Sequence, residues 1–231
     1  MARTGSEQLS LAIEPAEQPT SLPRSLRPMK PVLGHAPFDD DEWFFEPWWP
    51  GTPALAYVTP SGLRLQIDHL ADPASCFPEL ADLGRQFATP ELIVESTLLV
   101  LDDEGRPDGD LLRRRLTDAR DRAGWPALVC SDLLYFGHRS MLDVAFAERR
   151  AELGRQLSDG DACVVSRGLR GEGTTLAQAV ASMGLTEIGA RRMTARYRPG
   201  TTDENWLRLP VAEEPAPTTR PLLALLQRLP L

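Results

Sequence analysis

The sequence predicts an α+β fold of mostly antiparallel sheets with flanking helices. From Trp43 onward, short apolar runs are separated by Pro and Gly, a pattern typical of strands joined by turns. The expected strands outnumber the expected helices. The helical patterns also occur irregularly, without the regular strand–helix alternation that builds a parallel sheet. No internal repeat points to a solenoid or a propeller.

The expected strands are short runs rich in apolar, β-branched and aromatic residues, and they cover 43–46, 54–58, 63–67, 92–101, 127–135, 162–166 and 206–209. The sequence Thr-Pro-Ser-Gly at 59–62 predicts a turn between the second and third runs. Asp-Asp-Glu-Gly at 102–105 ends the fourth run, and Tyr-Arg-Pro-Gly at 197–200 predicts a further turn.

Three segments, 111–123, 147–157 and 174–183, carry apolar residues at helical spacing. The glycine-rich segment 168–173 is not a phosphate-binding loop, because it lacks the Gly-Lys-Ser/Thr ending and the Gly-x-Gly-x-x-Gly spacing. We therefore predict a mobile turn at 168–173.

Composition limits the classes of function. The chain of 231 residues has a net charge of −8, so we expect DNA binding to be weak or absent. Cys76, Cys130 and Cys163 show no spacing typical of a disulfide framework, which suits a cytoplasmic protein. The sequence shows no signal peptide and no apolar run long enough for a membrane span, so no membrane association is expected.

Composition also divides the chain into three parts. Residues 1–27 are polar and rich in proline, and predict a disordered N-terminal arm. Residues 28–210 form the expected domain. Residues 211–231 form a tail rich in proline and leucine, whose leucines favour a short helix that packs on its own domain or, alternatively, docks on a partner.

Several short motifs keep their order and spacing within residues 28–210: EPWWPG at 46–51, FPEL at 77–80, GRP at 105–107, DLLY at 132–135 and YRPG at 197–200. In these motifs the chain resembles the adenylation domain of bacterial ATP-dependent DNA ligases, of the DNA ligase D type. The resemblance implies an ATP-grasp-like nucleotidyltransferase fold. In such ligases an oligonucleotide-binding barrel follows this domain, and we expect no barrel in the residues after 210.

The resemblance places the catalytic lysine of these ligases at Trp48. In the ligases this lysine forms a covalent lysyl-AMP intermediate, and an indole has no amine for that attack. Glu46 and Gly51 of the same motif are retained. Lys30, the single lysine among 25 Lys and Arg residues, lies upstream of the motif and is expected on the solvated surface. We therefore expect no catalytic residue.

Other departures from the ligase pattern fall on positions that bind nucleotide or metal in those enzymes. Asp68 stands at an arginine position and would repel a phosphate. Thr97 and Thr186 stand at two metal-linked glutamates, and Mg²⁺ prefers carboxylate ligands. Ser131 replaces a phenylalanine that stacks on adenine. We therefore expect no metal site and no required cofactor, with ATP a candidate ligand if the pocket still binds nucleotide.

Two arginines preserve positive charge where the ligases have lysines. Arg191 and Arg208 are therefore the residues expected to hold an anion. The expected vestigial nucleotide pocket consists of Glu46, Trp48, Gly51, Asp68, Thr97, Ser131, Thr186, Arg191 and Arg208.

Three hypotheses follow. The first is a catalytically inactive ligase-like protein that binds or regulates a protein partner in DNA repair or end joining. The first alternative is a non-covalent nucleotide-binding protein that uses Glu46, Arg191 and Arg208. The second alternative is an active DNA ligase or nucleotidyltransferase with an unconventional site, for which Lys30 is the available lysine.

Overall fold

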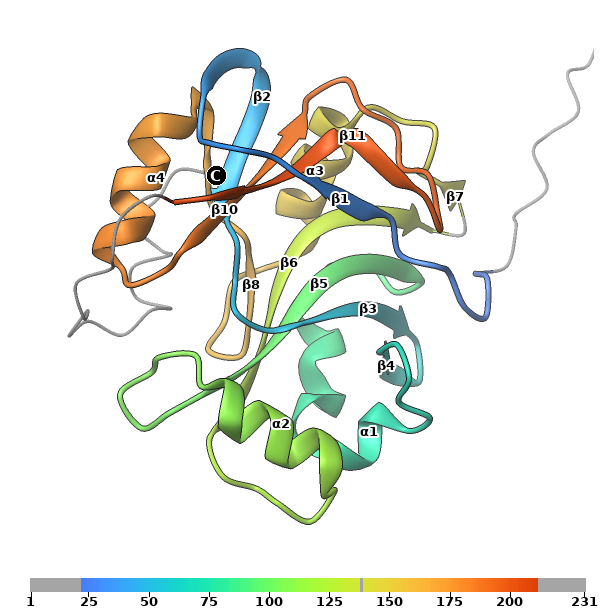
Figure 1. Ribbon diagram of the computed structural model, residues 1–231. Coiled ribbons are helices and arrows are strands. Elements are labelled where there is room, and N and C mark those ends of the chain that lie inside the picture. Colours follow the sequence, from blue (N-terminus) through green and yellow to red (C-terminus); the bar gives the residue numbers. More distant parts are fainter. Residues whose placement is uncertain (1–21, 138, 212–231) are drawn as a thin grey trace, which may run out of the picture.

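Two sheets stacked one above the other form the body of the protein (Figure 1). A computed structural model describes residues 22–137 and 139–211. The first sheet has five strands, in the order β1 (Lys30–Leu33), β11 (Thr202–Pro210), β10 (Glu187–Arg192), β2 (Asp39–Pro47) and β9 (Leu169–Glu172). The second has six, in the order β4 (Gly62–Gln66), β3 (Thr52–Thr59), β5 (Leu92–Leu101), β6 (Trp125–Phe136) and β7 (Arg139–Ser140), with β8 (Cys163–Val165) also paired to β6.

Most neighbouring strands are antiparallel, and the pairs β1–β11 and β6–β8 are parallel. This arrangement confirms the predicted α+β fold with mostly antiparallel sheets. Among the described residues, no helix combines the length and the apolar character that a membrane crossing requires.

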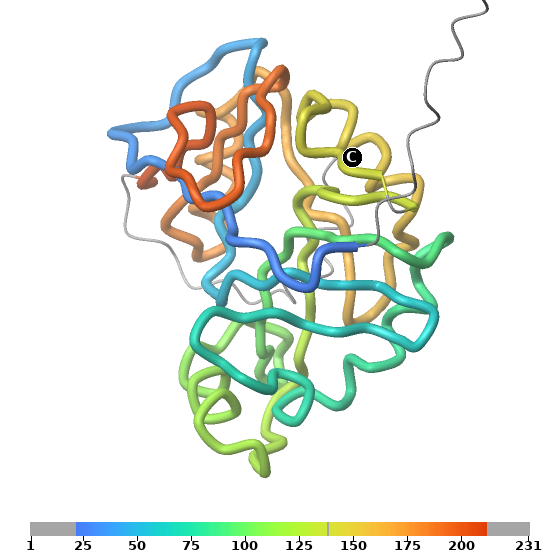
Figure 2. The backbone as a smooth tube through the Cα atoms, turned by 90° about the vertical axis from the view of Figure 1, so that its right-hand side faces the viewer, coloured from blue at the N-terminus to red at the C-terminus, as the bar shows by residue number. Residues whose placement is uncertain are grey.

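The helices cover the outer faces of the sheets (Figure 1). Helix α1 (Pro73–Cys76), the 3₁₀ helix η1 (Pro78–Gln86) and helix α2 (Gly109–Thr117) pack on the second sheet. Helix α4 (Gly173–Ser182) packs on β2 and β10, and helix α3 (Phe146–Gln156) lies against β6. One apolar core lies on the outer side of the second sheet, among β3, β5, β6, α1, η1 and α2. A second core joins α4, β2 and β10 to β5, β6 and β8, and so bridges the two sheets, whose backbones lie one above the other in Figure 2. A cavity lies between the facing sides of the sheets.

A third apolar cluster joins the two sheets at one end of this cavity. Its members come from both sheets and from the segment before β1, and they are Met29, Leu55, Tyr57, Ile93, Leu134, Tyr197 and Trp206. The Tyr197 hydroxyl accepts a hydrogen bond from the Met29 amide at 2.8 Å, which ties the residue before β1 to the loop before β11. These contacts hold the sheets at a defined separation.

Most predicted elements are confirmed, and the segment 92–101 matches β5. Helix α2 ends at Thr117 rather than at residue 123. The Thr117 hydroxyl bonds to the carbonyl of Arg113, and the Asp118 carboxylate accepts the Arg120 amide at 2.9 Å. Such side chains offer the backbone partners that compete with a further helical turn.

The predicted mobile turn at 168–173 is wrong, because this segment contains strand β9 paired with β2. A Cβ atom on Gly168 would collide with the Phe45 carbonyl, and one on Gly173 with the Phe38 carbonyl. The glycines therefore permit close backbone packing at the edge of the sheet. Strands β1 and β10 and helices α1 and η1 were also missed, since they lack a strong local period.

The ends of the chain lie partly outside the described residues. Residues 1–21 of the predicted arm and residues 212–231 of the predicted tail are not described. Residues 22–27 of the arm run beside β4, where Gln66 Nε2 donates to the Leu26 carbonyl at 2.6 Å and Arg64 donates to the Arg24 carbonyl at 2.9 Å.

Candidate nucleotide-binding site

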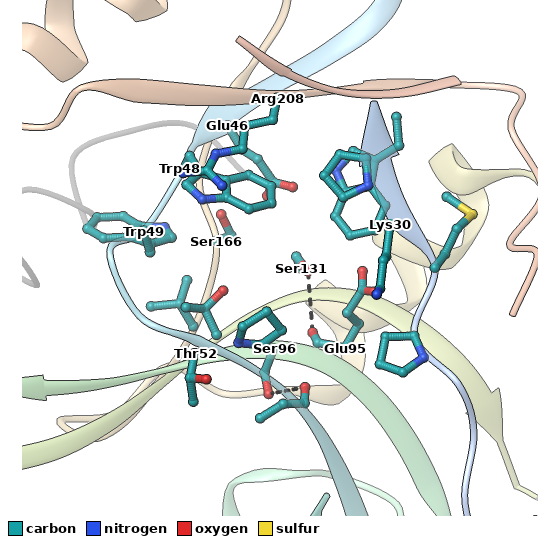
Figure 3. Close-up of a pocket in the computed structure, with 18 of the residues that line it drawn as sticks. Lys30, Glu46, Trp48, Trp49, Thr52, Glu95, Ser96, Ser131, Ser166 and Arg208 are labelled. Atoms are coloured by element: carbon teal, nitrogen blue, oxygen red, sulfur yellow. Dashed lines mark hydrogen bonds between the residues drawn. The ribbon is translucent and has the colours of Figure 1, made fainter. Parts of the chain in front are cut away.

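A cavity of about 360 Å³ lies between the facing sides of the two sheets (Figure 3). Its walls come from β1 and the segment before it, from the end of β2 and the β2–β3 connection, and from β5, β6, β10 and β11, among others. A second cavity of about 280 Å³ adjoins the first and shares Trp48, Trp49, Pro53, Thr97 and Arg208 with it. Both volumes are at the small end for ligand sites.

The structure brings all nine predicted pocket residues to these two cavities. The larger cavity is lined by Glu46, Trp48, Asp68, Thr97, Ser131, Arg191 and Arg208. Gly51 and Thr186 line the smaller one. Residues as far apart in the sequence as Glu46 and Arg208 thus meet because β2, β5, β6, β10 and β11 all border one space.

Trp48 lies in the connection that follows β2, with its amide bonded to the Glu187 carbonyl at 3.1 Å. Its ring is half-buried and tilted against Trp206, with ring centroids 6.2 Å apart. The Arg208 guanidinium lies 4.9 Å from the centre of the Trp48 ring. The indole is therefore packed between an aromatic and a cationic side chain at the wall of the cavity.

Gly51 lies where the β2–β3 connection passes directly over β5. A Cβ atom there would collide with the Leu98 carbonyl and would lie 2.7 Å from Thr97 Cγ2. The predicted glycine is therefore required by this close approach, which also sets where Trp48 enters the cavity.

Arg191 on β10 is the centre of a buried network of ion pairs behind the cavity. It is 4% exposed, and its guanidinium contacts three carboxylates. Nη2 donates to Glu95 at 2.5 Å, Nη1 donates to Asp132 at 3.1 Å, and Nε lies 3.7 Å from Glu46. The second oxygen of Glu95 accepts the Tyr197 hydroxyl at 2.8 Å.

Two arginines of helix α3 extend this network. Arg149 donates to Asp132 through Nε at 2.8 Å and through Nη2 at 2.7 Å. Arg150 Nη1 lies 3.7 Å from Glu46 and donates to the Ser131 carbonyl at 3.2 Å. The network therefore contains three carboxylates and three guanidiniums and is balanced in charge.

Burial and ion pairing shift the pKa values of these groups in opposite directions. Burial alone would lower the pKa of Arg191, but Glu95, Asp132 and Glu46 together raise it, so the guanidinium stays charged. Burial raises the pKa of Glu95, and the attraction of Arg191 offsets only part of that effect. Burial likewise lowers the pKa of Arg150. The network is stable only as a set, since removal of one member leaves another buried charge unpaired.

Both arginines that the sequence nominates for anion binding are already paired. Arg191 is enclosed by carboxylates, and Arg208 donates through Nε to Glu187 at 2.7 Å and also pairs with it through Nη2. A phosphate would have to displace these partners. The arrangement therefore provides little free positive charge for a triphosphate.

The remaining predicted residues supply few groups for a nucleotide or a metal. Ser131 Oγ is directed to the Glu95 carbonyl at 3.4 Å, and Asp68 lies exposed at the cavity mouth. Thr97 and Thr186 contribute no carboxylate. Within residues 22–137 and 139–211, no group of three or more His, Cys, Asp or Glu side chains is arranged to hold a metal ion.

The position of Lys30 was predicted only in part. The sequence analysis assigned it to the solvated surface; it is indeed exposed, but it also lines the larger cavity. Figure 3 shows its side chain reaching from β1 into the cavity, with the amino end toward Glu95. No local pattern placed it there, because the position depends on the pairing of β1 with β11.

Sequence reasoning also missed the residues of the charged network other than Glu46 and Arg191. Asp132 and Tyr197 lie within motifs that carried the resemblance, and Glu95 lies two residues before Thr97 on the same strand. The carboxylates of Glu95 and Asp132, in strands of otherwise apolar character, were the available signal, because a buried charge requires a partner.

The chain is similar in sequence to LigD proteins. No family model matches the chain. The multifunctional non-homologous end joining DNA repair protein LigD of Mycobacterium tuberculosis H37Rv is 26% identical over 167 residues, which cover 72% of this chain and 21% of that protein. LigD of Mycolicibacterium smegmatis is 23% identical over 199 residues, which cover 86% of this chain and 25% of that protein. The chain thus spans about a fifth to a quarter of the curated relatives it matches.

Solved structures decide the fold. The structure of mycobacterial DNA ligase D complexed with ATP and MES superimposes with a TM-score of 0.69 at 24% identity, over 80% of this chain and 60% of that chain. The ligase domain of M. tuberculosis LigD gives a TM-score of 0.68 at 24% identity, over 79% of this chain and 58% of that chain. The chain shares the fold of the LigD ligase domain. The ligase-like fold predicted from the motifs is therefore confirmed, and the sequence is related to LigD over 72% of this chain.

Proposed function

We propose that this ligase-like protein forms no lysyl-adenylate and acts by binding, as a component or regulator in DNA repair or end joining. One observation carries the proposal: Trp48 occupies the cavity wall where the resemblance places the catalytic lysine, and its ring packs against Trp206 and Arg208. The charge balance of the site supports the same conclusion, since Arg191 and Arg208 are both paired with carboxylates. The link to DNA repair rests on the similarity to LigD proteins.

Incubation with labelled ATP and Mg²⁺ tests this proposal. The protein is expected to yield no acid-stable adenylated species, and an intact LigD-type ligase serves as the positive control. Labelling of the protein would refute the proposal. Mass spectrometry of the labelled peptide would then identify the nucleophile.

One alternative has a specific observation in its favour. Lys30 lines the same cavity, so an unconventional nucleotidyltransferase would have an amine available there. In that case labelling would occur in the unmodified protein and would be lost in Lys30→Arg, which retains the charge but not the nucleophile. Equal absence of label in both proteins removes this alternative.

Non-covalent nucleotide binding is the other alternative, and calorimetric titration distinguishes it. The paired state of Arg191 and Arg208 leads us to expect little heat with ATP. We also propose weak or absent DNA binding, consistent with the net charge of −8. Fluorescence anisotropy with a labelled nicked duplex at low salt measures it, and tight binding would contradict the proposal.

A further inference from the structure

The larger cavity contains an amine whose charge no carboxylate neutralises. Lys30 forms no side-chain ion pair or hydrogen bond with any residue in the described part of the chain. The carboxylate of Glu95, toward which Figure 3 shows the Lys30 side chain pointing, has both oxygens engaged, one by Arg191 and one by Tyr197. Lys30 therefore differs from Arg191 and Arg208, whose guanidiniums are occupied by protein carboxylates.

Two buried groups in the same cavity also lack partners. Trp49 is 5% exposed and Ser166 is 1% exposed, yet neither Trp49 Nε1 nor Ser166 Oγ has a hydrogen-bond partner among the described residues. Both residues line the cavity. An indole N–H only donates, and a hydroxyl is able to donate. An unpartnered buried group of this kind requires explanation, and a bound acceptor would satisfy it.

The cavity walls indicate the body of the ligand. Trp48, Trp49 and Trp206 contribute aromatic surface, and several prolines contribute flat apolar surface. A space of about 360 Å³ accommodates one small organic molecule. One Glu46 oxygen also lacks a hydrogen bond, so a donor group on the ligand would have a partner.

The charges limit how many anionic groups the ligand carries. Lys30 is one free cation, and Asp68 at the exposed mouth would repel further negative charge. We propose that the cavity binds a small aromatic molecule bearing one anionic group, a carboxylate or a single phosphate, and that Lys30 binds this group. This inference rests on the proposed function, since it assigns a non-covalent ligand to the same site.

Matched ligands isolate the anionic group in calorimetric titrations of the whole chain. Naphthalene-2-carboxylate is compared with its neutral amide, and AMP with adenosine, so that the two pairs distinguish a carboxylate from a phosphate. At least one anionic ligand is expected to bind roughly tenfold or more tightly than its neutral analogue, the magnitude of a hydrogen bond to a charged group. ATP is expected to bind more weakly than AMP.

Variants test the role of Lys30. Lys30→Gln is expected to abolish the difference within the matched pair, and Lys30→Arg to retain most of it, with circular dichroism used to confirm folding. Arg113→Gln, at an exposed pair with Asp110 on α2, is the matched control and should leave the difference unchanged. Equal affinity within both pairs, or no binding up to about 1 mM, would overturn the inference. An adenylation assay is scored separately, because label on the protein would refute the proposed function, whereas failure of ligand binding would leave it intact.

Discussion

Asp132 provides the most direct test of the buried network. It is fully buried and accepts three hydrogen bonds from guanidiniums, two from Arg149 at 2.8 and 2.7 Å and one from Arg191 at 3.1 Å. In Asp132→Ala, Arg191 retains Glu95, but Arg149 is left with the backbone carbonyls of Val144 and Ala195. Arg149 is 1% exposed, so its charge would be buried without a counter-ion.

Removal of one partner from a buried pair costs about 3–5 kcal/mol, and we expect that loss in the free energy of unfolding. For a domain of this size, 1 kcal/mol shifts Tm by about 2–4 °C, so the expected fall is roughly 6–20 °C. Urea unfolding followed by circular dichroism measures the loss in the free energy of unfolding, and thermal unfolding measures the fall in Tm. Asp82→Ala is the control, because the Asp82–Arg85 pair has side chains 80% and 83% exposed and contributes about 0–1 kcal/mol. A loss in Asp132→Ala no larger than in this control would refute the reasoning.

Three further predictions concern the β2–β3 connection, the turn that follows β5, and the position of Trp48. Gly51→Ala should lower the free energy of unfolding by about 1–3 kcal/mol, because the added Cβ would collide with the Leu98 carbonyl, and a normal urea midpoint would contradict this. Hydrogen bonds from the turn amides and side chain of Arg106 lower the pKa of Asp102 despite partial desolvation, so its stabilising contribution is present above the unfolded pKa and is lost as pH falls below about 4. Asp102→Asn should therefore be less stable than the unmodified protein at pH 7, and this difference in the free energy of unfolding should shrink as the pH falls below about 4, as measured by urea unfolding at a series of pH values. A difference that stays constant in acid would exclude the charge as its cause. Trp48→Lys alone should yield no acid-stable adenylate, because Thr97 still supplies no carboxylate for Mg²⁺, and labelling of this variant would show that the single lysine suffices.

Local patterns in the sequence were sufficient for much of the fold. Strand β5 was predicted with its observed bounds because ten residues of apolar and β-branched character lie between clear turn residues. The motif order also predicted the ligase-like fold and the residues that border the two cavities. Strand β9 was mistaken for a turn, because its glycines indicate flexibility when read locally. In the folded chain the same glycines allow β9 to approach β2 closely.

The amino-acid sequence alone was enough to predict that a tryptophan stands at the lysine position, since that prediction needs only an identity and its place in a motif. It could not establish whether Arg191 and Arg208 are free to hold an anion. Arg191 pairs with Glu95 across 96 positions and with Asp132 across 59. Lys30 enters the cavity only because β1 pairs with β11, more than 170 positions away. The attraction between two opposite charges weakens as the distance between them grows. Whether an arginine is paired therefore depends on which strands become neighbours, and tertiary packing decides that.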